Sequence, residues 1–183
     1  MSFKQAAILA PVSFFLGVLF ICFNVDHRVL WGIVDDEVIK DGFQFYTTFF
    51  NAPPAIKALL HGMFVVGLLG LVAKLHKWNE SAVFFDGTSL AAYVFGVVVY
   101  LSVTINALRT IVTPTEEDTQ EDRVSALSVL SAGNVIMIGC FTFILLLQAG
   151  QEWALRAEQQ ALAALEAKKK QDATTVSAEK KTQ

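Results

Sequence analysis

The sequence is poor in charge and in the residue types that build catalytic or metal centres. Only 17% of its 183 residues are charged, and it contains three histidines and two cysteines. The formal net charge of −3 provides no basic surface for nucleic acid. Cys22 and Cys140 both lie in apolar runs, which predicts buried thiols and not a disulfide framework or a metal cage. We therefore expect no nucleic-acid partner, no metal and no cofactor.

Motifs of known enzyme classes are also missing. The sequence has no G-x-S-x-G, H-E-x-x-H or C-x-x-C motif and no phosphate-binding glycine loop. Its histidines fall in three separate segments, so their spacing predicts no metal cluster. The acidic run EEDTQED at 116–122 could bind a cation, but acids just before a helix also complement its amino-terminal dipole, and we favour that interpretation. The sequence thus indicates a protein that is not an enzyme.

Apolar residues are what the sequence has in excess. They make up 54% of the chain, against about 45–50% in soluble domains. A spanning helix needs about 20 apolar residues, and four stretches meet that length: Ala6–Val25, Ala55–Leu75, about 88–111 and about 124–148. The first is too long for a signal-peptide core and lacks a small-residue cleavage site, so we interpret it as a membrane anchor. The prediction is an all-α integral membrane protein with four transmembrane helices.

The distribution of basic residues predicts that both termini lie in the cytosol. With four spans the termini share a side, and lysine and arginine are more frequent on that side than on the other. The chain ends on AEKKTQ, which places Lys180 and Lys181 at positions −4 and −3. A dilysine there is an address for retrieval to the endoplasmic reticulum when the tail is cytosolic. A solvated lysine-rich tail is the alternative.

The sequence predicts three parts of the chain: residues 1–153 as a four-helix transmembrane domain, 154–170 as a cytosolic helix and 171–183 as a disordered tail. We predict the helix because residues 154–170 are rich in strong helix formers, and the disordered tail because residues 171–183 are small and polar. The longest connection, from Asp26 to Pro54, ends in GFQFYTTFFNAPP. Its aromatic residues are expected either at the membrane interface or folded over the helix ends.

A few polar residues fall within the predicted spans, while no aspartate or glutamate does. His61, Asn106 and Asn134 are most simply explained as hydrogen-bonding contacts between helices, with ligand binding as the alternative. Small residues, among them Gly62, Gly67 and Gly139, permit close helix approach, either inside this bundle or with other membrane helices.

Three stretches carry a resemblance to a known family: FYTTFFNAPPAIKALLHGMFVVGLLG, FFDGTSLAAYVFGVVVYLSVTINALRTIV and EDRVSALSVLSAGNVIMIGCFTFILLLQAGQEW. In this order and with these loop lengths, the chain from about Ser13 to Arg156 resembles the fungal endoplasmic reticulum membrane chaperones that package amino acid permeases for export. The anchors of the resemblance are the aromatic-then-proline entry to the second span, Asn106-x-x-x-Thr110, and Ser131-Ala132-x-Asn134.

The resemblance implies a membrane domain that shields permease helices and a cytosolic tail that helps to recruit vesicle coat components. On this hypothesis the client-binding groups include Asn134, Ser131, Asn106 and His61. The main alternative is a non-catalytic subunit of a resident membrane complex. A channel or transporter is disfavoured because the predicted spans lack carboxylates and paired helix breaks.

Overall fold

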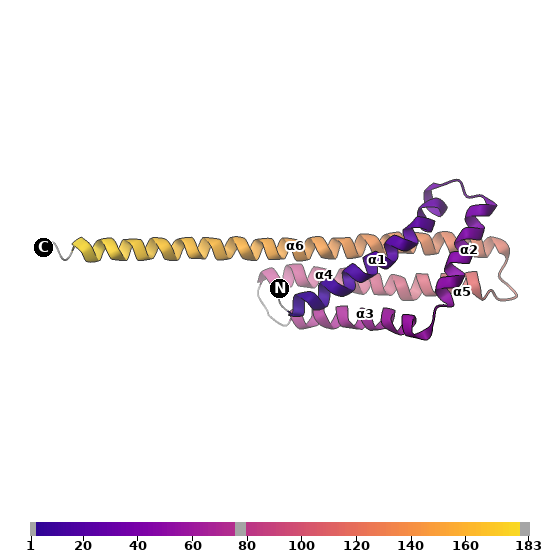
Figure 1. The fold of residues 1–183 in the computed structure, drawn as a ribbon, viewed down its shortest axis with the longest axis horizontal. Helices are drawn as coiled ribbons and strands as arrows, with labels where there is room; N and C mark the ends of the chain where they lie inside the picture. The colour runs from indigo at the N-terminus through magenta and orange to yellow at the C-terminus, as the bar shows by residue number, and fades with distance from the viewer. Residues whose placement is uncertain (1–2, 76–79, 180–183) are drawn as a thin grey trace. The chain divides into compact units, whose positions relative to one another are not determined.

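In the computed structural model, residues 3–75 and 80–179 are described, and every regular element among them is a helix. The elements in chain order are α1 (Phe3–Trp31), α2 (Asp36–Phe50), α3 (Pro54–Leu75), α4 (Glu80–Val99), the π-helical turn η1 (Tyr100–Thr104), α5 (Ile105–Val112) and α6 (Gln120–Glu179). Figure 1 shows their arrangement. The all-α prediction is confirmed.

Four of the helical segments are long and apolar enough to cross a membrane, as the sequence predicts. They are Phe3–Trp31, Pro54–Leu75, Val83–Val112 and Gln120–Lys169. The third span begins earlier than predicted and therefore includes Asp86. That carboxylate is 1% exposed and forms an ion pair of 2.9 Å with Lys74, which explains how a charged residue is accommodated at the start of the span.

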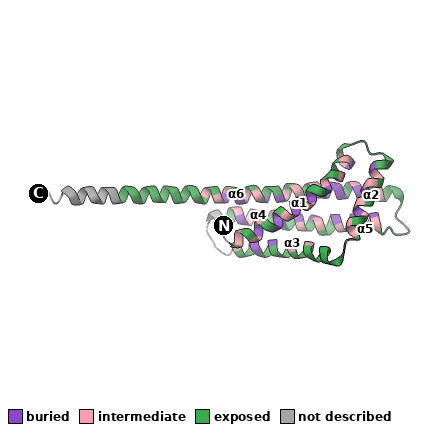
Figure 2. Ribbon diagram, in the orientation of Figure 1, coloured by how far each residue is buried: buried purple, intermediate pink, exposed green. Residues whose placement is uncertain are grey.

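The chain divides into two units, residues 1–147 and 148–183. In the first unit the start of α1 and the end of α3 lie at the same end of the bundle (Figure 1), where Lys4 Nζ donates to the carbonyl oxygen of Ala73 at 2.8 Å. Buried residues line the faces on which the helices meet (Figure 2). They form two core clusters, one of which includes Ile8, Leu71 and Ile144 and the other Val29, Ile111 and Leu127.

The buried side of α1 follows a regular stripe. Its buried residues recur every three or four positions: Ile8, Val12, Phe15, Leu19, Cys22, Asp26 and Val29, together with Pro11. This spacing keeps one face of a helix against its neighbours along the full length. The stripe connects the two core clusters. Its one acidic residue is Asp26, one position before the last.

Two glycines let α3 approach its neighbours closely. A Cβ at Gly70 would lie 3.0 Å from the carbonyl oxygen of Ala7 in α1, and one at Gly67 would clash with the ring and hydroxyl of Tyr93 in α4. Tyr93 is fully buried, and its hydroxyl donates to the carbonyl oxygen of Phe64 at 3.1 Å. By contrast, a Cβ at Gly62 or Gly139 would meet nothing within 4 Å. The structure thus separates glycines used inside the bundle from glycines on its outside.

The connection between the first two spans is mostly helical. Asp35 caps α2 by accepting a hydrogen bond from Val38 N at 2.8 Å, and an ion pair of 2.8 Å joins Arg28 to Asp41. Tyr46 is 2% exposed and belongs to the second core cluster, against which Phe43, Phe45 and Phe50 pack. The aromatic segment therefore covers the ends of the helices, one of the two arrangements expected from the sequence.

The start of α6 is built from part of the acidic run. Asp122 Oδ2 accepts hydrogen bonds from the backbone N–H of Thr119 at 2.9 Å and from its hydroxyl at 2.6 Å, while Asp122 N donates back to that hydroxyl oxygen at 3.2 Å. This reciprocal pattern is a capping box. It supports the interpretation of the run as a helix start.

In the second unit α6 continues as a helix to Glu179. Our prediction ended the helix at Lys170; it extends further because the following residues contain neither proline nor glycine. Every residue from Leu155 to Lys169 is exposed (Figure 2). Lys180 and Lys181 lie outside the described residues.

The close contact between Gly67 and Tyr93 leads to a stability prediction. Gly67→Ala should destabilise the folded protein by about 1–3 kcal/mol, because the added methyl group must displace a buried ring. The matched change Gly62→Ala on the same helix should be neutral or stabilising by about 0.5–1 kcal/mol. Unfolding of the two purified variants in detergent measures both effects. Equal stability of the two variants would contradict the proposed packing.

Candidate functional site: a buried polar cluster beside an apolar groove

The second core cluster encloses a carboxylate. Asp26 lies on the buried stripe of α1 and has no exposed surface. The sequence predicts a loop after Val25 and no acid within the spans; that expectation is wrong. The helix continues to Trp31, so Asp26 follows Cys22 by one turn on the same face. The three- and four-residue spacing that runs on to Val29 is the signal that could have identified it.

Three neutral side chains donate hydrogen bonds to this carboxylate. The Tyr46 hydroxyl of α2 and the Ser131 hydroxyl of α6 both donate to Oδ1, the second at 2.8 Å. Asn134 Nδ2, one turn further along α6, donates to Oδ2 at 2.9 Å and also to the Tyr46 hydroxyl oxygen at 2.9 Å. The cluster therefore links α1, α2 and α6 through a single carboxyl group.

No cation pairs with the carboxyl group of the cluster among the described residues. The ion pairs of the described residues are Arg28–Asp41, Lys74–Asp86 and Arg156–Glu152, none of which includes Asp26. A buried carboxylate without a cation depends on hydrogen bonds from its neighbours. Loss of one donor would leave part of the desolvation penalty uncompensated.

Tyr46 is held as a hydrogen-bond donor by its surroundings. Burial, reinforced by the nearby Asp26 carboxylate, raises the pKa of the Tyr46 phenol above its usual range. The phenol therefore remains protonated at physiological pH and continues to donate. Because Tyr46 belongs to α2, its hydrogen bond to Asp26 holds this connecting helix against the core of the bundle.

The four client-binding residues predicted from the sequence do not come together. Ser131 and Asn134 are buried at 0% and 3% exposure and bond to other helices, as the interhelical interpretation expected for Asn134. Asn106 and His61 are exposed and bond within their own helices, Asn106 Nδ2 to the carbonyl oxygen of Ser102 at 2.8 Å and His61 Nδ1 to that of Lys57 at 2.7 Å. Their assignment to client binding stays a prediction.

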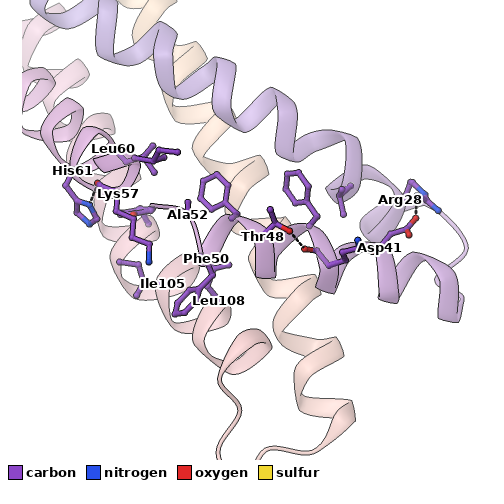
Figure 3. Close-up of a pocket in the computed structure, with 16 residues that line it drawn as sticks. Arg28, Asp41, Thr48, Phe50, Ala52, Lys57, Leu60, His61, Ile105 and Leu108 are labelled. Atoms are coloured by element: carbon purple, nitrogen blue, oxygen red, sulfur yellow. Dashed lines mark hydrogen bonds and ion pairs between the residues drawn. The ribbon is translucent and has the colours of Figure 1, made fainter. Parts of the chain in front are cut away.

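An apolar groove lies beside the buried cluster. It has a volume of about 810 Å³ and runs between α2, α3 and α5, with Val25 and Arg28 of α1 also in its lining. Figure 3 shows Lys57, Leu60 and His61 entering it from α3, opposite Ile105 and Leu108 of α5. The Lys57 ammonium lies 5.1 Å from the centroid of the Phe50 ring, at the corner between α2 and α3. His61 is thus a groove residue, which its position in the sequence did not indicate.

A second, internal cavity of about 40 Å³ lies within the bundle. Phe15, Phe64 and Phe141 supply part of its apolar lining, and Asn134, Tyr46 and Thr104 contribute polar side chains. A space of this size holds a water molecule or the tip of a side chain. Asn134 and Tyr46 connect the cavity to the Asp26 cluster.

The two sites offer non-covalent contacts. Among the described residues no group of three or more histidine, cysteine, aspartate or glutamate side chains could hold a metal ion. The Asp26 carboxyl group accepts hydrogen bonds from neutral donors and is enclosed by the bundle. The groove offers apolar surface with a cation at its rim. The arrangement suits helix packing and recognition.

The cluster predicts different costs for two asparagines in the spans. Asn134→Leu should destabilise the protein by about 1–3 kcal/mol, because Asp26 and Tyr46 would each lose a buried partner. Asn106→Leu should change stability by less than about 0.5 kcal/mol, since its side chain is exposed and bonds only to its own helix. Thermal unfolding in detergent compares the two. An equal loss of stability in both variants would contradict the inferred role of Asn134.

Comparison with known proteins agrees with the membrane architecture. A family model described as ER membrane protein SH3, the SHR3 chaperone family, matches residues 1–183. No curated protein and no solved structure matches the chain. Because the match extends over the full chain and the structure has four helices able to span a membrane, the protein belongs to this family of endoplasmic reticulum membrane chaperones.

Proposed function

We propose that this chaperone assists the folding and export of polytopic amino acid permeases by shielding their transmembrane helices. The observation that carries the proposal is the family match over the whole chain. The permeases as clients come from the resemblance of the three spanning stretches, and the groove supplies a surface suited to the task. The alternative is a permanent, non-catalytic subunit of a resident membrane complex.

The physical problem for such a client is a polar or charged group in lipid. A newly inserted transporter helix carries groups whose partners lie on helices not yet made, and each unsatisfied group costs free energy in the hydrocarbon. A protein that offers a temporary apolar groove and hydrogen-bonding groups lowers this cost. Since helix contacts in membranes are individually weak, the client can leave when its own partners arrive.

We further propose that both termini lie in the cytosol. Five of the fourteen lysines and arginines flank the spans on the side where α1 and α5 end and α6 begins, among them Arg28, Arg109 and Arg123. The other nine lie on the side of the termini, among them Lys4 and Lys74 at the end of the bundle where α1 begins. The orientation rests on the larger number of basic residues flanking the spans on the terminal side. With this orientation, Lys180 and Lys181 would serve as a retrieval signal and the tail would meet vesicle coat components.

Deletion of the gene tests the client class. Amino acid permeases should accumulate in the endoplasmic reticulum, while other secretory cargo reaches its destination at a normal rate. Microscopy of tagged permeases, with an unrelated plasma-membrane protein as control, measures the effect. Equal retention of both cargo types, or normal permease delivery, would contradict the proposal.

Affinity purification in mild detergent separates the chaperone from the subunit alternative. A chaperone should capture several newly made permeases in sub-stoichiometric amounts, and the captured amount should fall when protein synthesis is stopped. One stable partner at a fixed ratio would instead identify the protein as a subunit.

Engineered glycosylation sites test the orientation. A flexible insert bearing an N-x-[ST] site between Glu116 and Glu117 should be glycosylated, because this loop is proposed to face the lumen. The same insert at residues 76–79, between the second and third spans, should remain unmodified. The natural Asn79-Glu80-Ser81 site is too near the membrane to be informative, and Asn79 lies outside the described residues. Sugar on the insert at 76–79 alone would reverse the orientation and exclude a cytosolic retrieval signal.

A further inference from the structure

The apolar groove and the internal cavity share a wall. Phe49 of α2, Leu60 of α3, Tyr100 of η1 and Leu108 of α5 line both spaces. These side chains separate the groove from Asn134, Tyr46 and Thr104 in the cavity. Movement of one of these four side chains would give a group in the groove access to the polar side of the cavity.

Thr104 has an unusual environment at this cavity. It is 7% exposed, and its hydroxyl oxygen is the buried side-chain atom without a hydrogen-bond partner among the described residues. Thr104 is the last residue of the π-helical turn, where the backbone N–H of Ile105 donates to the carbonyl oxygen of Tyr100. That carbonyl is the acceptor that a helical threonine hydroxyl ordinarily uses, four residues back. A π-helical turn inside an α-helix is frequently found at a functional site.

The hydrogen bonds around the cavity leave an acceptor, the Thr104 hydroxyl oxygen, for an incoming group. The Asp26 carboxylate lies directly behind Tyr46 and Asn134, and no cation pairs with it among the described residues. The Asn134 amide nitrogen donates one hydrogen bond to Asp26 and one to Tyr46. The donors of the cluster are thus used inside it, so a side chain that enters the cavity must bring its own donor to the unpartnered Thr104 hydroxyl oxygen.

We propose that the groove binds a transmembrane helix of a client and that the cavity receives the tip of one hydrogen-bond-donating side chain from it, an amide, a hydroxyl or a lysine ammonium. Thr104 Oγ1 accepts the hydrogen bond. This inference rests on the proposed chaperone function and assigns it a site.

A helix fits these features better than a lipid does. The groove volume of about 810 Å³ is within the range of ligand clefts in proteins, about 300–1,000 Å³, so apolar contact alone would suit either occupant. An acyl chain, however, has no polar atom to offer an unpartnered hydroxyl deep in the bundle. A client helix whose own partners are missing carries the required donor.

Photo-crosslinking tests the site in the full-length protein reconstituted in phosphatidylcholine vesicles. The probes are synthetic transmembrane helices of leucine and alanine that carry one central asparagine, one central lysine or, as control, leucine. Benzoyl-phenylalanine replaces Phe49 in the shared wall or, as the matched control, Phe20, which is 71% exposed on α1. Crosslinking from position 49 should be about fivefold stronger to the asparagine and lysine probes than to the leucine probe. Crosslinking from position 20 should not distinguish the probes.

The substitution Thr104→Val separates recognition from a structural role. Valine has the shape of threonine but no hydroxyl, so removing an unpartnered buried group should leave the melting temperature unchanged or raise it. In the same variant, crosslinking from position 49 should no longer be stronger to the asparagine probe than to the leucine probe. Retention of that preference, or a lower melting temperature showing that the hydroxyl already has an internal partner, would overturn the proposal.

The crosslinking result also distinguishes this inference from the proposed function. If position 49 crosslinks to phosphatidylcholine and to no helix probe, the groove is a lipid site and the inference fails. If Thr104→Val has no effect on probe binding while permeases still depend on the protein in cells, the chaperone function stands and its site lies elsewhere. If permeases do not depend on the protein in cells, the proposed function itself fails.

Discussion

The buried carboxylate of Asp26 is the constraint on which the rest of the first unit depends. A charge in the interior of a membrane protein is expensive unless other groups satisfy it, and here the partners come from α2 and α6. To supply them, α6 must present Ser131 and Asn134 to α1, and α2 must fold back so that Tyr46 reaches the same point. One buried carboxyl group thereby fixes the relation of two consecutive helices, α1 and α2, to α6, which is distant in sequence.

The remainder of the bundle is held by packing. Lipid removes the hydrophobic driving force between helices, so close contact must replace it. Gly67 and Gly70 provide this contact by letting Tyr93 of α4 and Ala7 of α1 lie against the backbone of α3. The stacked rings of Phe15, Phe64 and Phe141 fill the centre at the same level. The Asp26 cluster near one end and the Lys74–Asp86 ion pair near the other add polar contacts to this packing.

A rigid polar centre beside an apolar groove suits the work of a chaperone. A chaperone for membrane proteins must keep its own helices together while it offers contacts weak enough to be released. The Asp26 cluster satisfies the first requirement, because its hydrogen bonds are internal and complete. The groove and the unpartnered hydroxyl of Thr104 lie next to this rigid centre. If the groove binds a client as proposed, the buried cluster beside it holds α1, α2 and α6 together.

Composition and periodicity alone determined the class of the protein. Long apolar runs predict helices, because lipid leaves no other way to satisfy the backbone, and the four spans follow from their length. The resemblance of the spanning stretches identified the family that the full-chain match then showed. The predicted helix boundaries were less accurate. Asp26 and Asp86 resemble loop residues as long as the groups that hydrogen-bond or pair with them are unknown.

Only the tertiary structure decided which polar residues meet. Asn134 and Asn106 look equivalent as isolated asparagines within apolar runs, yet one bonds across the bundle to Asp26 and the other to its own helix. Likewise, nothing in the sequence indicates that Thr104 ends a π-helical turn and lacks a partner. The reason is physical: local sequence sets helix formation and the face on which a side chain lies, but the identity of its partner depends on how helices far apart in the chain pack together.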